Sequence, residues 1–339
     1  MDEVNEHKKL KVAFFGTSDR SIPILEKLNE TFELVLCVTK NDVKVGRHQK
    51  LKETEVKKWA KTNNVKYVTI SGLKGTDLEK VIEQLNNSNV DFVLVADFSF
   101  IIPAPLIETF PKKLINIHFS LLPKYRGASP VQHAILNGDS ITGITIHLVE
   151  KRMDSGDILH QIGYKMAGNE TSGTLYDLLF KLAAENITEV LERYSQGQIT
   201  QIPQDEDSAT YTYSPTQPQS TFIFKEDAEI KWKSPADVIE RKIRAYNPWP
   251  IAWTLAEYLE KNPKLSGRNF ILRSNINKES KIRIHSAELD DQNKLKIRTL
   301  QPEGRNKINW EEFENGYVLP VIQEPKGLKD KLLNRDKTD

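Results

Sequence analysis

The chain has 339 residues, with 48 lysines and arginines, 47 aspartates and glutamates, and a formal net charge of +1. This length predicts two or three domains. The near-zero charge excludes a general attraction to nucleic acid or membrane, so any site for a polyanion must be a local patch. The single cysteine, Cys37, excludes internal disulfides and multi-cysteine zinc sites. It lies in the apolar run LVLCVT, where we expect it to be buried.

Membrane-spanning and exported proteins carry long apolar segments. No stretch of this sequence approaches the roughly 18 consecutive apolar residues of a spanning helix. The first residues, MDEVNEHKKL, contain no apolar signal region. We therefore expect a cytoplasmic protein with no membrane partner.

Strand-like and helix-like segments alternate along the first 200 residues. The apolar strand-like runs are residues 10–15, 33–39, 66–69, 91–96 and 113–119. Helical patterns separate the first four runs, with a polar loop at 40–53 and a proline-containing turn at 98–105. This alternation predicts an α/β domain with a Rossmann-like, mostly parallel sheet and helices on both faces. The sequence has no GxGxxG or GxxxxGKS/T motif, so the usual nucleotide-phosphate fingerprints are absent.

The next segment predicts a helix and a β-hairpin. Ser129 and Pro130 are typical first residues of a helix, and Gly138 is a typical end. Residues 143–149 and 157–164 are strand-like and should pair, with Asp154 at the tip of their connecting loop. A helix at 172–194 closes the first domain.

Composition divides the chain into a first domain at 1–200, a proline-containing linker at 201–219, a second domain at 220–323 and a charged tail at 324–339. Short strand-like runs at regular spacing predict a small, OB-like β-barrel for the second domain. Trp249 and Trp253 are expected in its core.

The run LINIHFSLLPKYRGASP, residues 114–130, is the most informative part of the sequence. Side chains of a strand alternate between faces, so Asn116, His118 and Ser120 share one face and Phe119 points to the other. In open α/β sheets ligands bind at the carboxyl ends of the strands. On spacing alone, two readings stay open: a functional site, or an amphipathic strand with one solvated face.

Five short motifs in order resemble the folate-dependent formyltransferase family. They are NxHxSLLP at 116–123, RG at 126–127, TGxT at 142–145, and DxG with DI at 154–158. FFGTS at 14–18 and ADFSFIIP at 96–103 are also similar to that family. Segments 38–56, 228–253 and 300–313 resemble the branch that formylates methionyl initiator tRNA, so the likeness covers nearly the whole chain.

The resemblance implies transfer of a formyl group from the co-substrate 10-formyltetrahydrofolate to the α-amino group of initiator methionyl-tRNA, by an enzyme without a metal. We expect a monomer. The implied catalytic residues are Asn116 and His118, facing the formyl oxygen, and Asp154, holding His118 and passing a proton. The implied folate-contacting residues are Ser120, Leu121, Leu122, Pro123, Phe98 and Ser99. Phe119 and Ser99 depart from the family pattern.

The tRNA expectation rests on a local charge excess. Residues 39–58 hold seven lysines and arginines against three acids, which suits contact with phosphates, and Arg47 and Lys50 are the candidate contacts. Some roles stay open. Arg126 either orients its loop or faces an anionic substrate, Asp154 can also be plain turn chemistry, and His147 is expected to be an ordinary strand residue.

Two other functions compete with this one. A formyltransferase for an amino sugar or another small amine would use the same first domain, but it gives no use to the basic loop and the second domain. A non-catalytic tRNA- or folate-binding relative would not need the set Asn116, His118 and Asp154.

Overall fold

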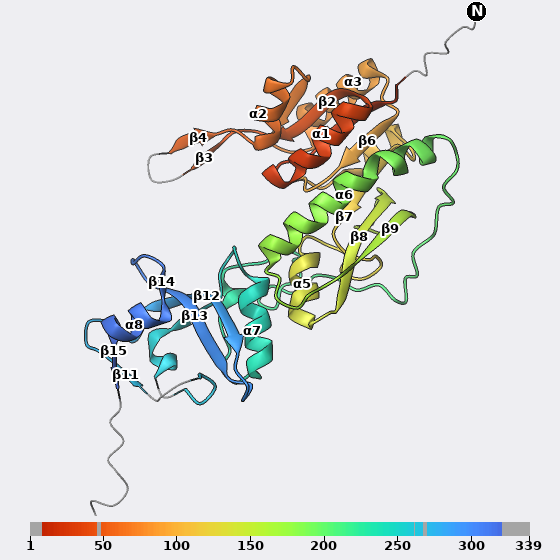
Figure 1. Cartoon of the computed structure of the whole chain (residues 1–339). Coiled ribbons are helices and arrows are strands. Elements are labelled where there is room, and N and C mark those ends of the chain that lie inside the picture. Colours follow the sequence, from red (N-terminus) through yellow and green to blue (C-terminus); the bar gives the residue numbers. More distant parts are fainter. Residues whose placement is uncertain (1–8, 46–48, 261, 267–269, 321–339) are drawn as a thin grey trace, which may run out of the picture. The chain divides into compact units, whose positions relative to one another are not determined.

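The computed structural model describes residues 9–45, 49–260, 262–266 and 270–320. Its contacts divide the chain into two units, Met1–Asp227 and Ala228–Asp339 (Figure 1). Residues 201–219, where the sequence predicts a linker, are hydrogen-bonded to the first unit: Ile158 N–H donates to the carbonyl of Ile202 at 2.8 Å, and Arg126 N–H to that of Thr210 at 2.8 Å. Within the described ranges no helix is long and apolar enough to cross a membrane.

The first unit is built on a seven-stranded sheet in the order β5-β2-β1-β6-β7-β8-β9. The first five strands in this order are parallel, and β8 and β9 run antiparallel to their neighbours. The predicted α/β class with a mostly parallel sheet is confirmed. The strands are β1 Lys11–Phe15, β2 Glu33–Lys40, β5 Tyr67–Ile70, β6 Phe92–Val95, β7 Leu114–His118, β8 Ile141–Leu148 and β9 Ile158–Lys165.

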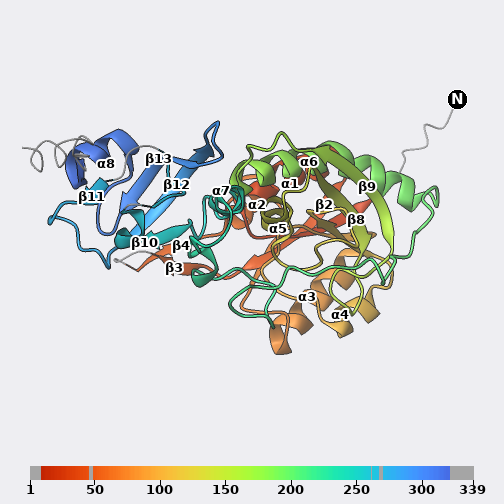
Figure 2. The same cartoon turned by 90° about the horizontal axis from the view of Figure 1, so that it is seen from below.

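Helices cover both faces of this sheet (Figure 2). On one face lie α1 Ile22–Thr31, preceded by the 3-10 turn η1 Asp19–Ser21, with α2 Glu55–Thr62, α5 Pro130–Asn137 and α6 Ser172–Ser195. On the other face lie α3 Gly75–Ser88 and α4 Ala104–Thr109. The short helix α4 occupies part of the segment predicted as a turn. Pro103 is its N-cap and Pro105 lies in its first turn, where proline is tolerated, so the prolines do not prevent a helix. Cys37 is fully buried, as predicted.

The predicted polar loop at 40–53 contains a hairpin, so the loop prediction is wrong there. Strand β3 Val43–Val45 pairs antiparallel with β4 Lys50–Lys52. The run KLK alternates between polar and apolar residues, a pattern that fits a strand. Its exposed lysines are equally typical of a polar loop, so the sequence did not indicate the strand.

The described part of the second unit combines antiparallel sheets with the α-helices α7 Ala236–Ala245 and α8 Trp310–Tyr317 and the 3-10 turn η3 Ala256–Leu259. The 3-10 turn η2 Glu226–Ala228 lies at the unit boundary. The strands are β10 Trp253–Leu255, β12 Lys281–Leu289, β13 Leu295–Pro302 and β14 Ile308–Asn309 in one sheet, and β11 Phe270–Leu272 with β15 Val318–Pro320 in the other. Trp249 is 51% exposed, so its predicted core position is wrong. It stands between Pro248 and Pro250 in a turn, outside any strand that could carry it inward.

Candidate active site

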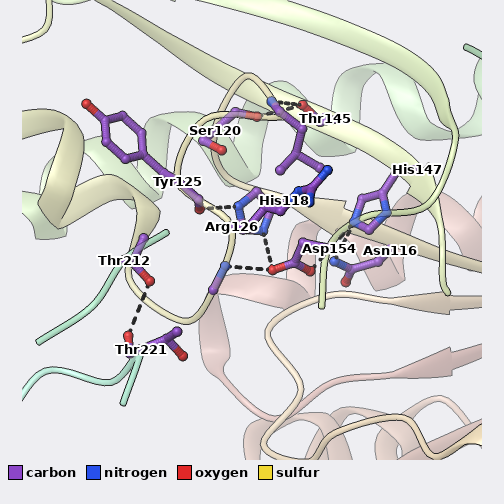
Figure 3. Close-up of polar contacts among 12 residues, drawn as sticks. Asn116, His118, Ser120, Tyr125, Arg126, Thr145, His147, Asp154, Thr212 and Thr221 are labelled. Atoms are coloured by element: carbon purple, nitrogen blue, oxygen red, sulfur yellow. Dashed lines mark hydrogen bonds and ion pairs between the residues drawn. The ribbon is translucent and has the colours of Figure 1, made fainter. Parts of the chain in front are cut away.

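Strand β7 places two polar side chains on one side of the sheet. Asn116 and His118 are two residues apart, so the pleat points them the same way. His118 is 5% exposed, and Asn116 is half-buried. Figure 3 shows both next to Asp154, which comes from the loop between β8 and β9. The structure therefore brings together the three residues predicted to be catalytic.

His147 orients the amide of Asn116. Its Nδ1 lies 2.8 Å from the carbonyl oxygen of Leu148, which can only accept, so Nδ1 carries the proton. Burial lowers the pKa of His147 to about 4, and the neutral ring keeps a lone pair on Nε2. That atom lies 3.1 Å from Nδ2 of Asn116 and accepts its N–H. The amide is thereby fixed with its nitrogen towards His147.

His118 is oriented in the same manner by a backbone carbonyl. Its Nε2 lies 2.9 Å from the carbonyl oxygen of Tyr125 and must donate to it. Nδ1 then faces Oδ2 of Asp154 at 3.7 Å. A proton added at Nδ1 would create an ion pair between imidazolium and carboxylate.

Asp154 lies between the two histidines (Figure 3). Its Oδ1 is 3.8 Å from Nε2 of His147, and its Oδ2 accepts the backbone N–H of Gly127 at 2.8 Å. Its φ is 49°, a left-handed conformation that aspartate tolerates better than most residues. Backbone strain of this kind gathers at functional sites. The carboxylate is thus aimed by its own backbone and held by the turn that contains Gly127.

Thr145 fixes the turn that follows β7. Its hydroxyl donates to the carbonyl of Ser120 at 2.6 Å and accepts the N–H of Leu122 at 3.0 Å. Gln161 donates both to this hydroxyl and to the carbonyl of Leu122. The hydroxyl of Ser120 donates to the carbonyl of Lys124 at 2.6 Å. The polar groups of this turn are therefore used in hydrogen bonds that fix the turn, and its half-buried Leu121 and Pro123 stay partly accessible.

The other predicted residues occupy different places. Phe98 is half-buried, and its ring packs against Phe15 and Phe100. Ser99 is exposed and donates to the hydroxyl of Thr17 at 3.0 Å. Phe119 points away from the site, as the alternation predicts, and packs against Phe180 with ring centroids 4.2 Å apart.

Sequence reasoning missed His147 as a residue of the site. The signal that could have found it is strand pairing, because β7 and β8 are antiparallel neighbours and Asn116 stands opposite His147 in their register. Lys50 is exposed on β4, and Arg47 lies outside the described residues.

Two domain families match this chain. Residues 9–191 match the formyl transferase family and residues 223–318 the formyl transferase C-terminal domain. Methionyl-tRNA formyltransferase of Listeria monocytogenes is 33% identical over 316 residues, covering 90% of this chain and 95% of the relative. The chain belongs to the methionyl-tRNA formyltransferase family. The Legionella pneumophila member is 36% identical over 74% of this chain and 76% of its own length.

Solved structures share the fold of this methionyl-tRNA formyltransferase family member. A sugar 3N-formyl transferase, WlaRD, crystallised with dTDP and 5-N-formyl-THF, has a TM-score of 0.52 at 20% identity and covers 93% of this chain and 99% of its own. The N-formyltransferase of Helicobacter canadensis has a TM-score of 0.52 at 23% identity and covers 81% of this chain and 95% of its own. At these identities the likeness concerns the fold alone.

Proposed function

We propose that this protein transfers the formyl group of 10-formyltetrahydrofolate to the α-amino group of initiator methionyl-tRNA, as a cytoplasmic monomer in translation initiation. The observation that carries the proposal is the placement of the Asp154 carboxylate between the Gly127 N–H at 2.8 Å and His118 Nδ1 at 3.7 Å. It stands in a chain whose relatives with this named activity align over both domain families.

The substrate brings the nucleophile in this reaction. An α-amino group has a pKa of about 7.7–8.0, so a useful fraction is neutral near pH 7. The protein then needs no serine or cysteine nucleophile. Its task is to hold two substrates together, which removes an entropic part of the barrier, and to stabilise the charge that develops.

Attack of the amine on the formyl carbon places negative charge on the formyl oxygen. Preorganised donors aimed at such an oxygen are a large part of enzymatic rate enhancement, and losing one costs about 10²- to 10³-fold in kcat. His147 already holds the nitrogen of Asn116, so this amide can present its second N–H without reorganising. A proton on Nδ1 of His118 would add a positive charge beside it.

Asp154 would manage the proton that the attacking amine loses. Its carboxylate is 17% exposed, so a bound substrate or a water can reach it. The Gly127 N–H holds one oxygen, which lies 3.7 Å from Nδ1 of His118, and the other oxygen lies near His147. In this position Asp154 can accept a proton from the amine and return it to the departing N10 of the folate, directly or through water.

The turn at residues 120–123 would hold the pterin of the folate co-substrate. Hydrogen bonds from Thr145 and Gln161 fix this turn, and its side chains offer apolar contact. The segment with Phe98 and Ser99 would form the opposite wall, as the family resemblance implies. A fixed, largely apolar wall with few polar groups is typical of small-ligand sites.

The β3–β4 hairpin would contact the phosphates of tRNA. Lys57 pairs with Asp42 and Glu53, and Lys58 with Glu55, so the acids of the segment neutralise the helix end. Among the described residues no ion pair forms at Lys44, Lys50 and Lys52, which are exposed. The charge excess therefore concentrates on the hairpin, where Lys50, and Arg47 outside the described residues, are our candidates.

One assay tests the activity. Purified protein is incubated with 10-formyltetrahydrofolate and either charged initiator methionyl-tRNA or a nucleotide-linked amino sugar, and the formylated product is measured. We expect formyl-methionyl-tRNA and no formylated sugar, with Asp154→Asn as the matched inactive control. Formylation of the sugar alone would replace the proposal by the amino-sugar reading, and no formylation of either would favour a non-catalytic relative.

A further inference from the structure

Among the residues that the structure describes, Arg126 is the largest fully buried side chain. Its guanidinium donates to Oε1 of Gln204 at 2.8 and 3.1 Å and to the carboxylate of Glu206 at 2.9 and 3.1 Å. Arg126 and Arg152 hold the pKa of Glu206 down to about 2, so the carboxylate stays charged. Arg126 is therefore committed to the protein itself and does not face an anionic substrate.

Gln204 connects Arg126 to the loop that contains Asp154. Arginine has only donors, so Oε1 of Gln204 accepts and its Nε2 points the other way. Nε2 donates to the carbonyl of Asp154 at 2.8 Å and to that of Gly156 at 2.8 Å. Both donors and both lone pairs of the amide are used, so its orientation is fixed.

Asp154 is thus held at its side chain and at its backbone carbonyl, and both contacts depend on Arg126. Its side chain accepts the N–H of Gly127, the neighbour of Arg126, and its carbonyl accepts from Gln204, the partner of Arg126. A left-handed aspartate needs such support, because the conformation is strained and persists only when its surroundings determine it. Gln204 lies in the interval 192–222 that neither domain family covers.

We infer that Gln204 is a positioning residue of the active site: anchored by Arg126, it sets the backbone of Asp154 and so aims its carboxylate at His118. The inference rests on the proposed function for its catalytic consequence, but its structural part does not need it. The chain between the two domain families is then part of the catalytic apparatus.

Gln204→Glu tests the two sets of contacts of Gln204 separately, those with Arg126 and those with the loop of Asp154. The carboxylate keeps its acceptors for Arg126, so the buried guanidinium stays satisfied, but it offers no donor to the carbonyls of Asp154 and Gly156. Misplacing a reacting group by about 1 Å can cost 10²-fold. We expect kcat to fall about 10- to 100-fold, with KM for both substrates within about threefold.

Gln201→Met is the matched control, because Gln201 stands in the same segment and its side chain contacts Lys112 and Tyr194. It should leave kcat unchanged. In an Asp154→Asn background, Gln204→Glu should cause no further loss, since two residues that act as one unit are not additive. Multiplying losses, or a kcat equal to that of the control, would overturn the inference.

A second measurement does not depend on activity. With ¹⁵N-glycine labelling, the exchange of the Gly127 amide proton reports its hydrogen bond to Asp154. Exchange should be faster in Gln204→Glu than in Gln201→Met; equal exchange would overturn the inference. If Gln204→Glu does not fold, Gln204→Met takes its place under the same criteria. If the wild-type protein formylates no tRNA, the proposed function fails, and the exchange still decides the role of Gln204.

Discussion

Nδ2 of Asn116 and Nε2 of His147 lie 3.1 Å apart across directly opposed positions of β7 and β8. The pair joins a side chain proposed to touch the substrate with one that is 2% exposed and cannot reach it. Because the lone pair on Nε2 must stay unprotonated to accept the amide N–H, the protonation state of His147 decides whether Asn116 is aimed. The strand pairing thus couples the amide to an imidazole that must remain neutral.

We expect His147 to make stability depend on pH. The unfolded chain takes up a proton at His147 near the ordinary imidazole pKa of about 6.5. In the folded protein, burial holds this pKa at about 4. Between these values the unfolded state binds more protons, so the free energy of unfolding falls as pH falls from about 6.5 to about 4. Urea unfolding at a series of pH values measures this slope.

His147→Gln is the matched variant, because its amide carries no titrating proton and its oxygen can still accept from Asn116. In this variant the slope between pH 6.5 and pH 4 should be shallower than in the wild type. An unchanged slope would show that other groups cause the acid destabilisation.

Asn116→Ala and Asp154→Asn test the proposed chemistry. Each should lower kcat by about 10²- to 10³-fold, the usual cost of losing an interaction made mainly in the transition state. Steady-state formylation kinetics and thermal unfolding measure activity and fold. His160→Asn on β9 is the control and should keep near-normal kcat. Near-normal rates in either of the first two variants would mean that their roles are misassigned.

Gly127→Ala should damage the turn that holds Asp154. At φ 117° a side chain is strained, and a Cβ would lie 2.5 Å from the Thr212 hydroxyl and 2.8 Å from Cβ of Thr221. We expect a loss of about 1–3 kcal/mol in unfolding free energy together with lower kcat. Gly168 has φ 87° and open space around it, so Gly168→Ala carries the conformational strain alone. Equal stability losses in the two variants would contradict the steric argument.

Lys50→Gln should weaken binding of methionyl-tRNA. Removing one phosphate contact lowers the slope of log affinity against log salt by about 0.7–1. Filter binding or fluorescence titration at several salt concentrations measures that slope. Lys181→Gln on α6 removes an exposed charge outside the hairpin and should leave the slope unchanged. A slope unaffected by Lys50→Gln would place the tRNA contact elsewhere.

Sequence periodicity predicted the mostly parallel sheet of the first unit and its α/β class, but not the order of the strands. The alternation in β7 was enough to place Asn116 and His118 together, because the pleat is a local property. The partners of these side chains depend on contacts that local patterns do not encode. His147 joins the site through antiparallel pairing with β7, and Gln204 through a segment that reads as a linker. The prolines of residues 201–219 predict a loop. They do not indicate whether such a loop is mobile or is held by hydrogen bonds, as this one is.

Phe119 follows His118 directly and packs against Phe180 and Tyr176 of α6. Neighbouring residues along a strand face opposite ways, so this aromatic contact joins the back of the site to the 24-residue helix α6. We expect a substitution along that face of α6 to shift His118 through its neighbour Phe119. Random mutagenesis for altered turnover should therefore recover changes in α6 as well as in the loops.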